Sequence, residues 1–268
     1  MPTNKPLTIG HWAILLVVAA AGGIALLQVT PHGLGISTDS VAYIGAARNQ
    51  AAGLGLVRLS GGGEVKPMTH FPPLYPLILS GLQLMGLPVL GGARVLSATA
   101  FAASGFLVGF LILRCSRSFL AALVGTALFV ASPHMLEVHT WAMTEGLYIF
   151  LGLGAMVLLV GYGESHRRAL LLAAALAVAA AYLTRYVGVS LLAAAALYVA
   201  LQPGPVRRRS IDLAALLTIG LLPMAGWMAR NLILTGSPTN RTLQFHIPSA
   251  DTVRDGFVVV WQWLVPYQ

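Results

Sequence analysis

The sequence has little charge and almost no cysteine. Only 9% of its 268 residues are charged, whereas soluble domains carry about 25%. The single cysteine, Cys115, excludes an intramolecular disulfide and a cysteine-based zinc site. The charge that is present is mostly basic, with a formal net charge of +8. Because the basic residues stand at the ends of apolar segments, they fit anionic lipid headgroups better than nucleic acid.

Apolar residues are abundant, at 57% of the chain, and they are gathered into long runs. Crossing the roughly 30 Å of a bilayer's hydrocarbon takes about 20 apolar residues in a helix. The expected fold class is therefore all-α, a polytopic transmembrane bundle in which residues 1–268 form one domain. Runs near the required length predict about seven spans, at 10–29, 92–113, 118–133, 144–162, 168–184, 186–202 and 211–229.

The short loops between these runs predict an orientation. Arginines concentrate at 114–117, 167–168 and 207–209, and seven spans would put all three loops on the same side as Lys5. The positive-inside rule makes that side cytoplasmic. The long loop 30–91 is then outside. The composition, rich in alanine and arginine, suggests a bacterial inner membrane.

The long loop carries two segments that differ from the apolar runs around them. They are 37–43, with the sequence STDSVAY, and 69–76, with the sequence THFPPLYP. Prolines favour the start of a helix over its interior. We therefore expect residues 72–87 to form a re-entrant or surface helix that leads into the second span.

Asp39 is the first candidate for chemistry. It precedes an expected helix over residues 40–52, with Tyr43 one turn further on. Aspartate is a preferred N-cap, so a capping role is one interpretation. The other is a catalytic base at the membrane surface, where an idle carboxylate would be costly.

Glu145 and Arg185 stand at the outer ends of two predicted spans. An acid in a first helical turn complements the helix dipole, but Glu145 would also lie at the depth of Asp39 and could orient an acceptor or a metal. Arg185 could reach up to the lipid headgroups. It could equally bind a phosphate, because a guanidinium group matches phosphate oxygens.

Three weaker signals lie on the outer side. His70 precedes the double proline and could contact a phosphate or an acceptor. The spacing H-x-x-E-x-H at 134–139 is a weak metal signature, and an exposed polar loop explains it as well. The sequon at 240–242 carries little weight. No dedicated metal site is predicted, although a divalent cation stays open as a cofactor.

Taken in order, the segments 37–43, 69–76, 144–146 and 183–186 resemble the GT-C superfamily of integral membrane glycosyltransferases. The chain is most similar to the branch that contains protein O-mannosyltransferases and lipid A aminoarabinose transferases. The resemblance covers nearly the whole chain as the N-terminal half of such an enzyme. It implies transfer of a sugar from a polyprenyl-phosphate donor to an acceptor hydroxyl on the outer face, with inversion. The acceptor could be a protein, a lipid or a glycan.

The resemblance also implies roles for individual residues. Asp39 matches the catalytic carboxylate and Glu145 the second acid. The family often has a lysine where this chain has Phe71, so His70 or Arg185 is expected to take over contact with the donor phosphate. The expected substrate-binding residues are Tyr43, His70, Pro73, Tyr75 and Arg185.

Two other functions remain open at this point. A flippase or transporter of lipid-linked sugars would need charged residues or broken helices in mid-membrane, and the sequence shows almost no charge there. An inactive, lipid-binding fragment of a transferase is the second alternative. It is suggested by the greater length typical of the family and by a further element expected to begin at 257–265.

Overall fold

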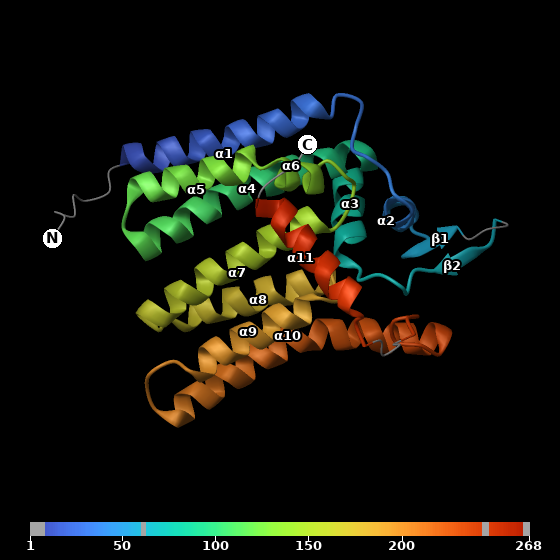
Figure 1. The fold of residues 1–268 in the computed structure, drawn as a ribbon. Coiled ribbons are helices and arrows are strands. Elements are labelled where there is room, and N and C mark those ends of the chain that lie inside the picture. The colour runs from blue at the N-terminus through green and yellow to red at the C-terminus, as the bar shows by residue number, and fades with distance from the viewer. Residues whose placement is uncertain (1–8, 60–62, 243–246, 265–268) are drawn as a thin grey trace.

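The computed structural model describes residues 9–59, 63–242 and 247–264, without the side chains of 262–264. Most of these residues form helices packed into a bundle, with two short strands at one end (Figure 1). The elements are α1 (Ile9–Val29), α2 (Thr38–Ala51), β1 (Val57–Leu59), β2 (Val65–Pro67), α3 (Leu74–Leu84), α4 (Val89–Ser116), α5 (Phe119–Ala131), α6 (Pro133–His139), α7 (Glu145–Ser165), α8 (Arg168–Thr184), α9 (Gly188–Ala200), α10 (Val206–Thr235) and α11 (Ala250–Leu264).

Four helices are long and apolar enough to cross a membrane: α1, α4, α7 and α10. A bend of 56° separates α5 from α6, and this pair would make a fifth span. Helices α8 and α9 are apolar but have only 17 and 13 residues, so even α8 is about 25 Å long. The prediction of an all-α membrane bundle is confirmed. The predicted count of seven spans is not, because length and composition support four or five.

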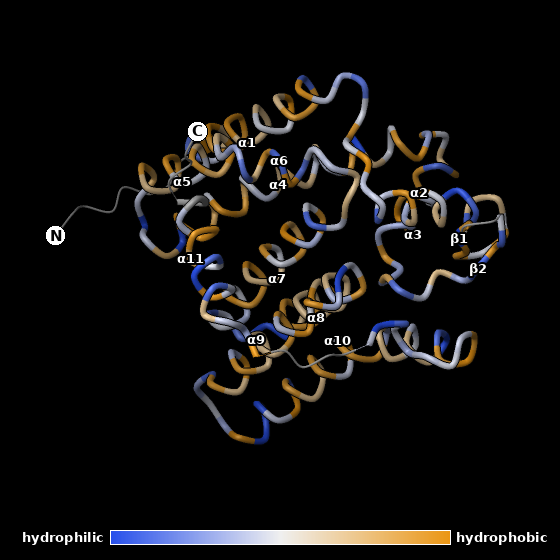
Figure 2. Tube along the Cα trace, turned by 45° about the vertical axis from the view of Figure 1, so that its right-hand side comes forward, coloured by the Kyte–Doolittle hydropathy of each residue, from blue (hydrophilic) through white to orange (hydrophobic). Residues whose placement is uncertain are grey.

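Figure 2 shows apolar residues along the helices of the bundle and hydrophilic ones at their ends. The α4–α5, α7–α8 and α9–α10 junctions lie where α1 begins, and we call this the arginine-rich end (Figure 1). Lys5 lies outside the described residues. Asp212 is buried near this end, where it accepts a hydrogen bond from Tyr162 at 2.6 Å. Arg168 and Arg208 approach its carboxylate to 3.4 and 3.5 Å, so this buried charge is compensated.

Small residues let α4 pack closely against its neighbours. A Cβ atom built on Gly109 would lie 3.4 Å from Leu15 of α1 and would overlap the hydroxyl of Thr126 on α5. Alanine plays the same part in α8, which packs against α7, α9 and α10. Ala174, Ala175 and Ala181 are fully buried there. This packing fixes the end of α8, after which Arg185 follows.

The loop between α1 and α4 folds at the opposite end, which we call the α2 end. Ser37 caps α2: its Oγ accepts from the Ser40 backbone at 3.2 Å, and Ser40 Oγ accepts from the Ser37 backbone at 3.0 Å. This is a capping box closed by two serines. Asp39 is therefore not the N-cap but lies in the first turn, and α2 begins at Thr38, two residues before the predicted start.

A β-hairpin and a short helix complete the α2 end. Strands β1 and β2, which were not predicted, form an antiparallel hairpin with Arg58 opposite Lys66. The predicted short helix after the prolines is α3, which begins after Pro73 and packs against α2 and α4. Far along the chain, the element expected at 257–265 is part of α11, which begins earlier, at Ala250.

The close contact between α4 and α5 makes a prediction about stability. Replacing a helical glycine by alanine ordinarily stabilises by about 1 kcal/mol. At Gly109 the added methyl group would overlap Thr126, and overpacking costs about 1–3 kcal/mol. We expect Gly109→Ala to lower the thermal unfolding temperature in detergent. Gly154→Ala on α7, where nothing lies within 4 Å, should keep or raise it. Equal shifts in both variants would contradict the tight α4–α5 packing.

Candidate functional site

Backbone contacts bring the first turns of α2 and α7 together. Gly35 donates to the Thr140 carbonyl at 2.8 Å and accepts from the Ala142 backbone at 2.9 Å. A side chain at position 35 would collide with the Trp141 ring, because a Cβ atom there would lie 2.8 Å from it. Glycine at this position therefore lets the segment after α1 run beside the segment before α7. The carboxylates that follow each segment end up at the same end of the bundle.

A pocket of about 170 Å³ lies where these segments meet the end of α8. Four of the predicted site residues line it: Asp39, Tyr43, Glu145 and Arg185. They come from two helices, α2 and α7, and from the residue that follows α8. The bundle therefore brings together side chains that the sequence separates by up to about 150 positions. The remaining lining residues are Phe71, Pro72, Met143, Thr144, Thr184, Tyr186, Val187 and Arg241.

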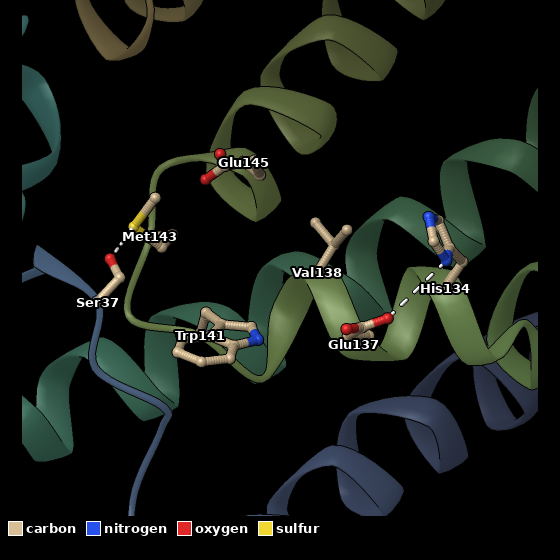
Figure 3. A pocket seen from close by; sticks show the side chains of 7 residues that line it. All are labelled: Ser37, His134, Glu137, Val138, Trp141, Met143 and Glu145. Carbon is tan, nitrogen blue, oxygen red and sulfur yellow. Dashed lines mark hydrogen bonds and ion pairs between the residues drawn. The ribbon is translucent and has the colours of Figure 1, made fainter. Parts of the chain in front are cut away.

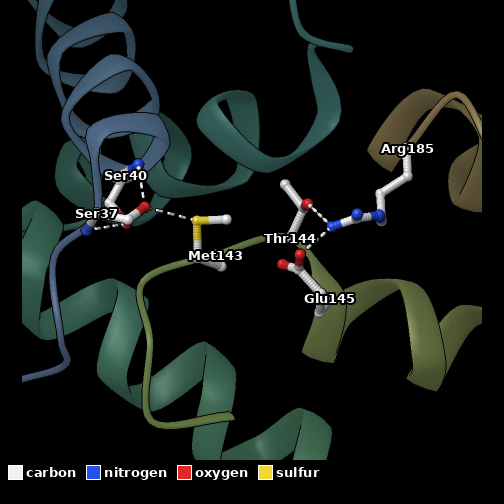
Figure 4. Close-up of polar contacts among 6 residues, drawn as sticks. All are labelled: Ser37, Ser40, Met143, Thr144, Glu145 and Arg185. Carbon is white, nitrogen blue, oxygen red and sulfur yellow. Dashed lines mark hydrogen bonds and ion pairs between the residues drawn. The ribbon is translucent and has the colours of Figure 1, made fainter. Parts of the chain in front are cut away.

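Glu145 and Arg185 form an ion pair in this pocket (Figure 4). Arg185 Nη1 contacts Glu145 Oε1 and also donates to Thr144 Oγ1 at 3.0 Å. Both charged side chains are about one-third exposed, at 34% and 33%, so a ligand can reach them. The second carboxylate oxygen, Glu145 Oε2, is buried and has no hydrogen-bond partner among the described residues. Glu145 thus fixes the position of Arg185.

Asp39 is the unpaired charge of the pocket. It is half-buried in the first turn of α2, where an acidic residue complements the helix dipole. Its carboxylate makes no hydrogen bond or ion pair within residues 9–59, 63–242 and 247–264. An ionised carboxylate that faces a pocket without a partner can accept a proton from a bound hydroxyl.

An aromatic cluster forms the wall of the pocket beside Asp39. The ring of Tyr43 lies 4.9 Å from that of Phe71 and 5.5 Å from that of Tyr75. Burial raises the pKa of Tyr43 to about 12, against smaller opposite effects of Thr144 and Arg185. Burial likewise raises the pKa of Tyr75, which is only 2% exposed. Tyr43 therefore offers the pocket a neutral hydroxyl, whereas Tyr75 packs behind it.

Arg241 completes the pocket, and sequence reasoning missed it. Its guanidinium group lies 5.0 Å from the centre of the Tyr186 ring, and its Nε donates to the His70 carbonyl at 3.4 Å. His70 and Arg241 are 171 residues apart, and the only sequence signal at 240–242 was a sequon. No spacing rule could have found this contact, because it depends on how the chain returns after α10.

Hydrogen bonds hold the segment after α10 in place. Asn231 donates to the carbonyl of Thr69 at 3.2 Å and to that of Pro238 at 3.0 Å. Asn240 donates to Thr69 Oγ1 at 2.6 Å, and its carbonyl lies 3.2 Å from His70 Nδ1. His70 thus helps to hold this segment in place, and it does not line the pocket. Pro73, at the start of α3, does not line it either.

A second, larger pocket of about 410 Å³ adjoins the first and shares Met143 and Glu145 with it (Figure 3). Val138 and Trp141 form much of its apolar wall. Ser37 also reaches into it and donates to Met143 Sδ at 3.1 Å. The two pockets meet at Glu145, so a ligand in one can extend into the other.

The H-x-x-E-x-H spacing does not gather its side chains. His134 Nδ1 lies 3.8 Å from Glu137, whereas His139 is fully buried, with its Nδ1 2.7 Å from the Met135 carbonyl. In the part of the chain that the structure describes, no three His, Cys, Asp or Glu side chains are close enough together to hold a metal ion.

Comparison of the chain with models of known protein families, with curated proteins and with solved structures found no match. The chemistry of the residues that line the pocket is therefore the basis on which a function is proposed below.

The raised pKa of Tyr43 predicts a loss of stability at high pH. The unfolded chain releases this proton near pH 10.0, whereas the folded protein keeps it up to about 12. The stabilisation is fully present below pH 10 and is lost as the pH rises to about 12. Tyr43→Phe has no such proton, so its stability should fall less over this range, by up to about 2–3 kcal/mol. Unfolding in detergent at several pH values measures this. Parallel declines of wild type and variant would contradict it.

Proposed function

We propose that the protein is a membrane glycosyltransferase that moves a sugar from a polyprenyl-phosphate donor to an acceptor hydroxyl, with inversion. The observation that carries this proposal is one pocket in which the unpaired carboxylate of Asp39 meets the guanidinium groups of Arg185 and Arg241. A base and a phosphate-binding pair are the groups that such a transfer requires.

In the proposed reaction, Asp39 is the base. The acceptor oxygen attacks the anomeric carbon from the face opposite the phosphate, and its proton passes to the Asp39 carboxylate. The bond between that carbon and the phosphate oxygen breaks, and the lipid phosphate leaves with the electron pair. A phosphate is a good leaving group, so the reaction needs electrostatic support for its charge more than a general acid.

Arg185 and Arg241 are proposed to bind the donor phosphate. Their guanidinium groups suit phosphate oxygens, and each can use several N–H donors at once. Arg185 can therefore keep its contact with Glu145 while it binds a phosphate through other nitrogens. Glu145 is in this view a positioning residue. Arg241 supplies the second cation that the family resemblance expected from a lysine at the position of Phe71.

The larger pocket is proposed to hold the first units of the polyprenyl chain. Its wall of Val138 and Trp141 is apolar, as a lipid chain requires, and it opens next to Glu145. Helix α3 packs against α2 and α4 and does not line this pocket.

The arrangement in the membrane follows from the same proposal. Helices α1, α4, α5, α7, α8, α9 and α10 run between the two ends of the bundle (Figure 1). We propose that each of them is a span, with α8 and α9 as short ones. By the positive-inside rule the arginine-rich end is cytoplasmic and the α2 end is outside. A bacterial inner membrane is the proposed location, with a protein, lipid or glycan as acceptor.

Removing the base tests the proposal most directly. Asp39→Asn keeps the size of the side chain but cannot accept the proton, so transfer should slow by about 10²–10⁴-fold, with donor binding retained. Asp251→Asn, which changes an exposed acid in the first turn of α11, is the matched control. The assay follows radiolabelled polyprenyl-phosphate sugars in nanodiscs. Unchanged transfer by Asp39→Asn would exclude this role.

Wild-type protein that binds the donor without any turnover would favour the alternative of an inactive lipid-binding fragment. Movement of the intact donor across the bilayer, with its sugar still attached, would favour the flippase.

The phosphate-binding role of Arg241 makes a separate prediction. Hydrogen bonds to charged groups contribute about 1.5–3 kcal/mol, so Arg241→Gln should weaken donor binding by roughly 10-fold or more. Arg254→Gln, an exposed arginine of α11, should leave it unchanged. Titration calorimetry with the lipid phosphate measures both. Equal affinities of the two variants would remove Arg241 from the phosphate site.

A further inference from the structure

A groove of about 490 Å³ lies along α2 on the face away from the candidate site. Asp39 and Tyr43, four residues apart, face the candidate pocket. Val41, Gly45 and Arg48 line the groove, and helical spacing places them on the other side of α2. The rest of its wall comes from the hairpin, from the segment after α1 and from the start of α4.

Two arginines without counter-ions line this groove, Arg48 of α2 and Arg58 of β1. Neither guanidinium group makes a hydrogen bond or an ion pair with any residue that the structure describes. Lys66, which pairs with Arg58 across the hairpin, is by contrast neutralised by Glu64 at 2.9 Å. No acidic residue lines the groove. The groove therefore carries uncompensated positive charge, which favours an anion.

The hairpin holds the two arginines near each other. Asn49, which follows Arg48, donates through its side chain to the Val57 carbonyl at 2.9 Å. Val57 precedes Arg58 in β1, so this one hydrogen bond ties the strand to the helix beside both guanidinium groups. This hydrogen bond therefore fixes the two backbone segments from which Arg48 and Arg58 extend.

The walls beside the arginines are apolar and exposed. Val41 and Leu59 are 63% and 69% exposed, and Ile36 and Leu90 are 46% and 44% exposed. Ile36 follows α1 and Leu90 lies in the first turn of α4, and both of these helices are candidate spans. The groove therefore lies at the level where the hydrocarbon of a bilayer gives way to phosphate groups. A ligand that satisfies it has an anionic head and an apolar chain.

We propose that this groove binds an anionic phospholipid of the surrounding membrane. The phosphate lies between Arg48 and Arg58, and the upper part of an acyl chain covers Ile36, Val41 and Leu90. The site is separate from the proposed transferase pocket and does not depend on that function. It would anchor α2 and the hairpin to the membrane surface.

The test measures lipid binding by the full chain in neutral detergent. Dioctanoyl phosphatidylglycerol should raise the unfolding temperature in a saturable way, while dioctanoyl phosphatidylcholine and inorganic phosphate should not. Each basic residue near an anionic surface contributes about a fivefold factor in affinity, so R48Q/R58Q should bind about 25-fold more weakly. Equal effects of both lipids, or an effect of phosphate alone, would overturn the proposal.

Two matched variants separate this site from general charge effects. R117Q/R207Q removes the same charge from exposed arginines of the arginine-rich end and should keep the shift; loss of the shift here would place binding at that end instead. R48K/R58K keeps the charge and should retain most of the shift in unfolding temperature. If R48Q/R58Q does not fold, photoactivatable phosphatidylglycerol decides with wild-type protein alone. Label within 36–59 is expected, and label confined to other segments would overturn the proposal.

Discussion

The apolar interior of the bundle leaves charged side chains only its two ends. Both ends satisfy this constraint, but in different ways. At the arginine-rich end, Asp212 is enclosed by Tyr162, Arg168 and Arg208, and the result is a closed network. At the α2 end the compensation is incomplete, because Asp39 has no partner within the described chain. This difference is the reason why we place the proposed chemistry at the α2 end.

Helix α2 is the element that organises this end. One face supplies Asp39 and Tyr43 to the candidate pocket, and the opposite face supplies Arg48 to the groove. The helix can do both because it lies at the end of the bundle (Figure 1), with the candidate pocket on one side of it and the groove on the other. Its start is fixed by the serine capping box, so the direction in which Asp39 points is set by hydrogen bonds of the backbone.

The sequence was a good guide to features that depend on local patterns. Apolar runs predicted the helices, and the prolines at 72–76 predicted the short helix α3 that follows them. Asp39, Tyr43, Glu145 and Arg185 were chosen one by one, and the structure places all four in one pocket. Contacts between residues far apart in the sequence could not be predicted from local patterns. Arg241 reaches the pocket through contacts with Tyr186 and His70, and nothing in its own neighbourhood marks it.

The structure differs from the sequence-based predictions in two other respects, the N-cap of α2 and the number of spans. Ser37 competes with Asp39 for the cap of α2, and either residue type suits that position, so local preference could not decide. Hydropathy alone also cannot tell a short apolar helix from a full span. Helices α8 and α9 have only 17 and 13 residues, so their apolar composition does not by itself make them full spans.

The hydrogen bonds that hold the segment after α10 in place also determine the formal charge of the pocket. With Arg241 in place, two carboxylates and two guanidinium groups line the pocket and their formal charges sum to zero. The hydrogen bonds through which His70 contacts Asn240 and Arg241 are exposed to solvent. If these contacts open, Arg241 leaves and the formal charge becomes −1, which repels a phosphate. The affinity of the pocket for anions is therefore set by a short segment at its rim, without movement of the helices.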